Sequence, residues 1–269
     1  ISVTGVQTCA LPILTEYLAK LQAFRYKQHS PIRIDDFELE AIAELLLKPQ
    51  AESDTKYVIR RERVLRVAWK IFLYIHCMDI VVREHHAQKL TESQESAIPH
   101  VAQFLQTKFH HQTGPLKQSA VYRWALSNVI AHVNAAIDTA RATASADFEF
   151  DIDTGVSSDA LLIAVIPQEV LFPFSNILKE CQRRFLISLD GFDRNFDEFR
   201  RIAQRSGIPP EGLSKIASLE KDWVRSLLYL CREIKRDKDR WGLFQLMDFC
   251  VTIPKDRCIE ILKIGRAHV

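Results

Sequence analysis

Residues that could do chemistry follow directly after one short apolar run. The run Phe185-Leu186-Ile187-Ser188-Leu189 stops at Asp190-Gly191. A short apolar run bounded by turn residues predicts a buried strand. Ligands of open α/β sheets bind beyond the carboxyl ends of the strands, and a carboxylate there is suited to hold Mg²⁺ against nucleotide phosphates. Asp190 is therefore the first candidate metal ligand.

A turn accounts for Asp190 as well as a binding site does. Many strands end in Asp because its side chain starts a turn. An apolar strand followed by Asp is a weak signal by itself. Both interpretations of Asp190 stay open on this feature alone.

The residues after the strand form a more specific pattern. The run Asp190-Gly191-Phe192-Asp193-Arg194 resembles the Walker B region of P-loop NTPases, particularly the KAP-type and STAND-like ATPases. The resemblance implies ATP and Mg²⁺ as ligands, with Asp190 as the magnesium carboxylate. It also implies that Asp193 orients the attacking water and that Arg194 is an auxiliary charge. Gly191 departs from the acidic residue that many such ATPases carry after the first Asp, so the identity of the general base stays open.

A second apolar run near the end of the chain agrees with this resemblance. Phe249 to Ile253 looks like the next core strand of the same fold, which carries residues that sense the γ-phosphate at its end. Thr252, Lys255 and Asp256 are the matching candidates. The alternative is that Lys255 and Asp256 only cap a helix that starts near Arg257.

The phosphate-binding loop itself is missing from the sequence. That loop needs a Gly-Lys-Ser/Thr run, and no Gly-Lys pair occurs in the chain. We expect that truncation removed it, because residues 14–26 begin in the middle of a helical pattern and a strand follows near 31–34. The stretch from Leu14 to Leu18 looks like the segment just after a lost Gly-Lys-Ser/Thr. The resemblance covers residues 14–47 and 185–262.

Both ends of the chain look like translated sequencing-adapter DNA. The codons CAG ACG TGT GCT CTT CCG ATC encode Gln7 to Ile13, and their reverse complement, shifted by one base, encodes Ile264 to Val269. We therefore expect residues 1–13, in which the adapter match covers 3–13, and residues 264–269 to be artefacts. Residues 14–263 would then form one incomplete P-loop NTPase-like domain.

The periodicity of apolar residues predicts an α/β fold. We expect a partial P-loop NTPase-like parallel sheet with core strands near 31–34, 185–190 and 249–254, and a large helical insertion at about 56–147. Two further apolar runs could be strands, at 148–152 and 161–166. Helices are expected elsewhere, at 39–46, 58–86, 101–109, 121–137, 168–182, 196–206 and 213–234.

Composition narrows the class of protein. Without Arg266, 35 Lys and Arg face 34 Asp and Glu, so no polyanionic partner such as nucleic acid is supported. No apolar run approaches the ~20 residues that cross a membrane, and we expect no membrane span. The five cysteines outside the adapter-like ends contain no Cys-x-x-Cys pair, which favours reduced, buried thiols in a cytoplasmic protein.

Other residues that could bind ligands have simpler explanations. The pairs His85-His86 and His110-His111 lack the i, i+4 spacing of a zinc site on a helix and are expected at the surface. Trp69 and Trp223 lie on apolar helix faces and are expected in the core. The adjacent Asp35-Asp36 is explained by helix capping.

The leading hypothesis is a cytoplasmic ATPase in which hydrolysis drives a conformational or regulatory switch, with nucleotide as the ligand and an unidentified protein as a possible partner. This chain alone should be inactive, because phosphoryl transfer needs the phosphate loop and the metal together. The main alternative is a non-enzymatic, helix-rich interaction or scaffold protein. A metal-dependent nuclease using Asp190 and Asp193 would need further carboxylates.

Overall fold

The fold is mainly helical. The computed structural model describes residues 28–33, 37–47, 61–84, 92–110, 114–143, 157–181, 185–190, 201, 204–205, 221–231 and 247–251. Of the described residues that lie in helices or strands, 87% are helical. The expected α/β fold class is therefore wrong, and the sheet is a small component beside a large helical body.

The sheet has three parallel strands in the described part of the chain. They are β1 (Gln28–Arg33), β2 (Phe185–Asp190) and β3 (Met247–Val251). The order is β1-β2-β3, so β2 lies in the middle. Compared with the expected ranges, β1 begins three residues earlier and β3 two residues earlier, while β2 has the expected limits.

Local sequence explains where each strand sits. Ile187, Ser188 and Leu189 are consecutive and all buried, which is typical of a central parallel strand covered on both faces. Pro31 lies inside β1 and has no backbone N–H to donate. Proline is tolerated at the edge of a sheet, and β1 is an edge strand of the described sheet.

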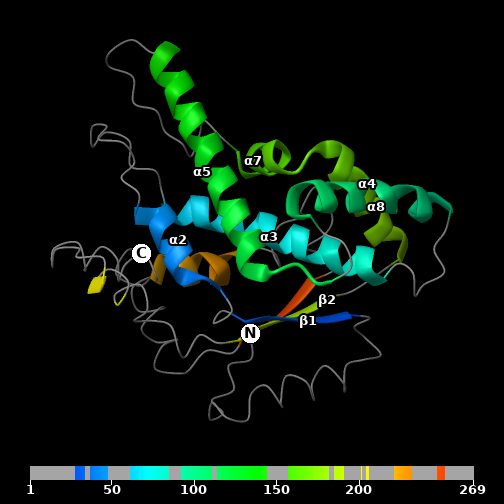
Figure 1. The fold of residues 1–269 in the computed structure, drawn as a ribbon. Coiled ribbons are helices and arrows are strands. Elements are labelled where there is room, and N and C mark those ends of the chain that lie inside the picture. Colours follow the sequence, from blue (N-terminus) through cyan, green and yellow to red (C-terminus); the bar gives the residue numbers. More distant parts are fainter. Residues whose placement is uncertain are drawn as a thin grey trace.

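Six labelled helices build the body, and Figure 1 shows them on one side of β1 and β2. Helix α5 packs along α3, α4 packs along α8, and α7 contacts both α3 and α5. The far end of α5 projects away from the other helices (Figure 1). A further helical segment, 221–231, packs under α3. The helices are α2 (Leu39–Leu47), α3 (Arg61–Glu84), α4 (Glu92–Phe109), α5 (Gln118–Thr143), α7 (Ser158–Val165) and α8 (Gln168–Cys181).

Two sequence expectations in the helical body were wrong. Residues 161–166 were a candidate strand but lie in α7 and its end. Ser157 caps this helix, because its Oγ accepts a hydrogen bond from the Ala160 backbone N–H at 3.0 Å, and such a cap favours a helix. Helix α4 starts nine residues before the expected 101 and passes through Pro99. Pro99 has no backbone N–H, so the carbonyl four residues earlier lacks its helical hydrogen bond. Because Pro99 is exposed, water can bind that carbonyl instead.

A cluster of buried aromatic rings joins the segment after β1 to the helices. Phe37 contacts Trp69 at 5.5 Å and Phe72 at 5.6 Å between ring centroids, both from α3. It also contacts Tyr122 of α5 at 5.7 Å and Trp223 of segment 221–231 at 5.8 Å. These five residues, the aromatic cluster below, are all at most 4% exposed. The expected core position of Trp69 and Trp223 is thus confirmed.

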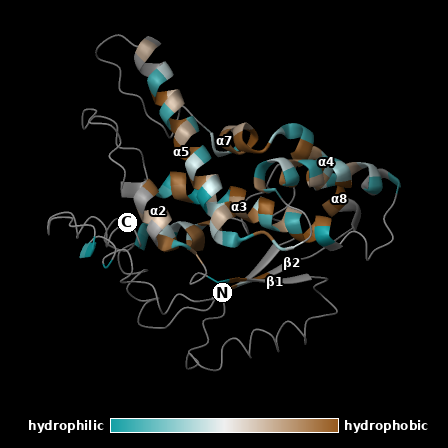
Figure 2. Cartoon of the chain, viewed as in Figure 1, coloured by the Kyte–Doolittle hydropathy of each residue, from teal (hydrophilic) through white to brown (hydrophobic). Residues whose placement is uncertain are grey.

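The helices differ in how apolar residues are distributed along them. Polar and apolar residues alternate along α5, whereas apolar residues dominate parts of α7 and α8 (Figure 2).

In the described part of the chain no single helix is long and apolar enough to cross a membrane. The pair α7 and α8, bent by 101°, meets that criterion by length and composition only.

Several expected elements lie outside the described residues. They are the helix at 14–26, the strand at 148–152, most of the helix at 196–206, and both adapter-like ends.

Replacing Phe37 with Ala should destabilise the protein by about 3–5 kcal/mol, because deleting a buried aromatic ring leaves a cavity. Urea denaturation followed by tryptophan fluorescence measures this change directly, since Trp69 and Trp223 touch the ring. Phe172→Ala is the matched control, because Phe172 is 51% exposed, and it should cost less than about 1 kcal/mol. Equal losses in the two variants would show that the aromatic cluster does not hold the fold together.

Candidate functional site

The candidate site is the carboxyl edge of the sheet. Asp190 is the last residue of the middle strand β2, and its Cα partner on β1 is Arg33, the last residue of that strand. On the other side, Leu189 pairs with Val251 at the end of β3. All three strands therefore end at one edge, where parallel sheets place their ligands.

The structure describes only one of the expected site residues. The backbone of Asp190 lies at the end of β2. Asp193, Arg194, Thr252, Lys255 and Asp256 lie outside the described residues. Their roles therefore stay predictions from the sequence.

Burial changes sharply between the last two residues of β1. Ile32 and Leu189 are fully buried neighbours in the register, at 0% exposure each. The next residue on β1, Arg33, is exposed. On β1 the change from the apolar interior to solvent therefore falls between Ile32 and Arg33, and Arg33 is the register partner of Asp190.

A second charged group lies just after β1. Glu38 forms ion pairs with Lys117 and, at 3.2 Å, with Arg123 of α5. The hydrogen bond and the charge of Lys117 lower the pKa of Glu38, and the charge of Arg123 adds to this. These side chains are well exposed, so the pairs add little stability. Their role is to fix the segment after β1 against the start of α5.

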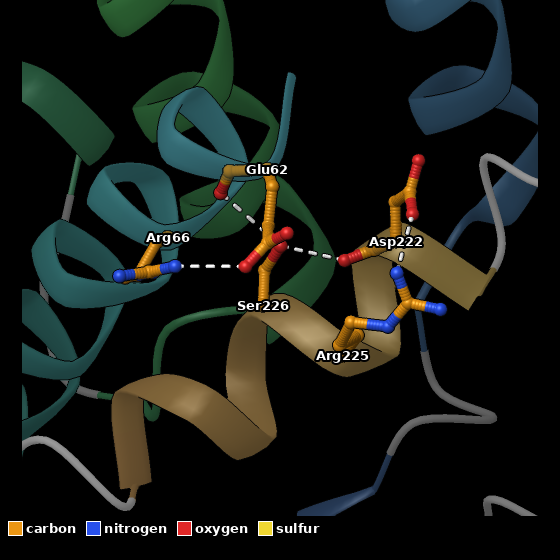
Figure 3. Close-up of polar contacts among 5 residues, drawn as sticks. All are labelled: Glu62, Arg66, Asp222, Arg225 and Ser226. Carbon is orange, nitrogen blue, oxygen red and sulfur yellow. Dashed lines mark hydrogen bonds and ion pairs between the residues drawn. The ribbon is translucent and has the colours of Figure 1, made fainter. Parts of the chain in front are cut away.

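Polar contacts place segment 221–231 against the start of α3 (Figure 3). Ser226 is fully buried, and its hydroxyl donates a hydrogen bond shared between two backbone carbonyls, that of Asp222 at 2.5 Å and that of Glu62 at 3.2 Å. Arg66 pairs with the Glu62 carboxylate at 2.8 Å and lies over the ring of Tyr229, 5.8 Å from its centroid. Arg225 pairs with Asp222 at 3.4 Å. These contacts join segment 221–231 to the start of α3 beside the aromatic cluster.

A buried carboxylate in α3 was missed by the sequence analysis. Asp79 is 1% exposed, and its Oδ2 accepts from Arg83 Nε at 3.2 Å and from the Leu116 backbone N–H at 3.3 Å. It therefore ties the segment before α5 to α3. Its sequence signal was an Asp inside an apolar run with Arg four residues later, a spacing that places the pair on one helix face.

Burial makes two cysteine thiols in the core unsuited to act as nucleophiles or metal ligands. Burial raises the pKa of the Cys77 thiol well above its usual value, and it raises the pKa of Cys231 to about 12. Both thiols are free and buried, as the sequence predicted for cysteines of this chain. A thiol that stays protonated is a poor nucleophile and metal ligand.

The described residues contain no group of three or more His, Cys, Asp or Glu side chains that could hold a metal ion. His110 is exposed, as expected for that histidine pair, and ends α4 with a φ of 52°.

Comparisons with known proteins add no relative. No protein-family model matches the chain, and neither a curated protein nor a solved structure matches it. The functional argument therefore rests on the residues of this chain and on their geometry.

His76 should make stability depend on pH. The pKa of His76 is lowered to about 4, first by burial and then by the charge of Arg83. The unfolded chain takes up a proton near pH 6.5 and the folded one only near pH 4. The stability from a neutral His76 is thus complete above pH 6.5 and is lost as the pH falls to 4, by about 3 kcal/mol in total.

Urea denaturation at pH 7 and pH 4.5 measures this loss. His76→Gln, which cannot titrate, should flatten the difference between the two pH values. His110→Gln, at an exposed histidine, should leave the difference as in the wild type. An unchanged pH dependence in His76→Gln would disprove the assignment.

Proposed function

We propose that this chain belongs to an ATP-hydrolysing protein of the P-loop type, resembling the KAP-type and STAND-like ATPases, in which Asp190 helps to bind magnesium and the nucleotide phosphates. The observation that carries the proposal is the position of Asp190 at the carboxyl end of the middle strand of a parallel sheet. Ligand sites of open parallel sheets form at that edge.

The order of the strands supports the same proposal. β2 follows β1 after more than 150 residues, yet it pairs beside it in parallel, and β3 then pairs beside β2. If β1, β2 and β3 correspond to the second, third and fourth core strands implied by the resemblance, the strand that ends in Asp190 lies between its expected neighbours.

The donor chemistry at the edge fits magnesium. Mg²⁺ keeps several waters and usually binds through one or two carboxylates plus substrate phosphates. A single carboxylate at position 190 satisfies that pattern, whereas a zinc site needs three or four protein ligands. Bound there, Mg²⁺ would neutralise charge that builds up on the phosphate oxygens.

The proposed reaction is hydrolysis of the γ-phosphate bond. A water oxygen attacks the γ-phosphorus, the bond from this phosphorus to the β,γ-bridging oxygen breaks, and ADP and inorganic phosphate leave. Asp193 is the candidate that orients the water, and the proton of the water leaves on the inorganic phosphate. Thr252, Lys255 and Asp256 are the candidates that contact the γ-phosphate.

The helical body gives hydrolysis a route to a conformational change. The segment that leaves β1 near the site carries Phe37 into the aromatic cluster, which contacts α3, α5 and segment 221–231. A shift of the β1 end on phosphate release would therefore move rings that the helices share. This fits a regulatory switch better than small-molecule chemistry.

Asp190→Asn in the full gene product should lower kcat for ATP hydrolysis by at least about 100-fold, a loss of the size seen when one electrostatic catalytic group is removed. Phosphate release in the presence of Mg²⁺ measures it. Asp138→Asn is the matched control, because Asp138 is an exposed carboxylate on α5, and it should keep wild-type activity. Equal kcat values for Asp190→Asn and the wild type would refute the proposal.

The helix-rich scaffold is a second candidate, favoured by the 87% helical content. The two candidates differ in their response to nucleotide. MgATP should raise the melting temperature of the full gene product if it binds the folded state, and a scaffold without a nucleotide site should show no shift.

A further inference from the structure

We infer that Arg33 binds a phosphate group of the nucleotide, as a second charged residue of the site beside Asp190. The inference rests on the proposed function and extends it to a residue that the sequence pattern did not single out. It would give the site a cation from β1 in addition to the carboxylate from β2.

The register places Arg33 directly beside Asp190. The two residues are the final pair of the parallel ladder between β1 and β2. Adjacent strands lie about 4.8 Å apart, a gap that an extended arginine side chain spans. The Arg33 guanidinium is therefore within reach of a ligand that binds at the end of β2, beside position 190.

The second observation is that the Arg33 side chain is not engaged elsewhere. Other arginines of the described chain have carboxylate partners, as Arg66 does with Glu62, Arg83 with Asp79 and Arg123 with Glu38. Within the described residues Arg33 is exposed and has neither a side-chain hydrogen bond nor an ion pair. Its donors are thus available to a ligand.

Arginine chemistry matches a phosphate in particular. The guanidinium carries five N–H donors in a planar fork, which binds two phosphate oxygens at once. A phosphate group bound at the ends of β1 and β2 would be within reach of this fork. Arg33 would then strengthen ground-state binding of the nucleotide, whereas Asp190 also acts on the reaction itself.

Arg33→Ala in the full gene product tests the inference. Calorimetric titration with magnesium and adenylyl imidodiphosphate, a non-hydrolysable ATP analogue, should give a Kd roughly tenfold to hundredfold higher, the effect of losing a charged hydrogen bond. The KM for MgATP should rise with it while kcat stays near the wild-type value. Arg33→Lys should recover part of the affinity, because it keeps the charge but loses the fork.

Arg123→Ala is the matched control, since Arg123 is an exposed arginine already paired with Glu38, and its Kd should equal the wild-type value. Because Arg33 is exposed, both variants should melt within a few degrees of the wild type. A wild-type Kd for Arg33→Ala would overturn the inference, and so would a loss of kcat at unchanged KM.

The results for Asp190→Asn and for the wild type distinguish a failure of the Arg33 inference from a failure of the proposed function. If Asp190→Asn abolishes hydrolysis and Arg33→Ala binds the analogue normally, only the role of Arg33 is wrong. If the wild type neither binds the analogue nor hydrolyses MgATP, the proposed function and the inference fail together.

Discussion

The packing of Phe37 against α3, α5 and segment 221–231 is the interaction on which the rest of the fold depends. Trp69 stands at the centre of that contact, 4.3 Å from Tyr122 and 5.2 Å from Trp223 between ring centroids. Its indole Nε1 donates to the Trp223 carbonyl at 3.2 Å. Burial raises the pKa of Tyr122 well above its usual value. The cluster joins four segments that are distant in sequence, because large rings bury much apolar area in few residues.

This arrangement makes the small sheet dependent on the helices. Three short strands have little stability by themselves, and the segment after β1 is fixed by Phe37 in the core and by Glu38 on the surface. The backbone position of Asp190 depends in turn on its pairing with β1. Strand pairing and the packing of Phe37 therefore together position the carboxyl edge of the sheet.

Buried polar contacts add specificity to the apolar packing. Asp79 accepts from the Leu116 backbone, and Ser226 donates to the Glu62 carbonyl. Lys70 of α3 pairs with Asp159 at the start of α7 at 3.2 Å. Each contact joins segments far apart in the chain and would be lost if a helix slid along its neighbour. Because an unsatisfied buried polar group costs more than a satisfied one contributes, such contacts favour one arrangement of the helices over others.

The sequence by itself determined the local features whose signals lie within one segment. Apolar periodicity located α2, α3, α5 and α8, the run ending at Asp190 located β2, and Trp69 and Trp223 were assigned to the core. The prediction was wrong where the local pattern is ambiguous. Residues 161–166 were predicted as a strand, but they follow the Ser157 cap and lie in α7 and at its end. Helix α4 was predicted to begin at 101, but it begins earlier and contains Pro99. Tertiary structure alone decided that helices dominate, that Asp79 is buried, and that Arg33 stands beside Asp190. Those outcomes depend on which distant segments meet, and no local pattern contains the long-range packing that brings them together.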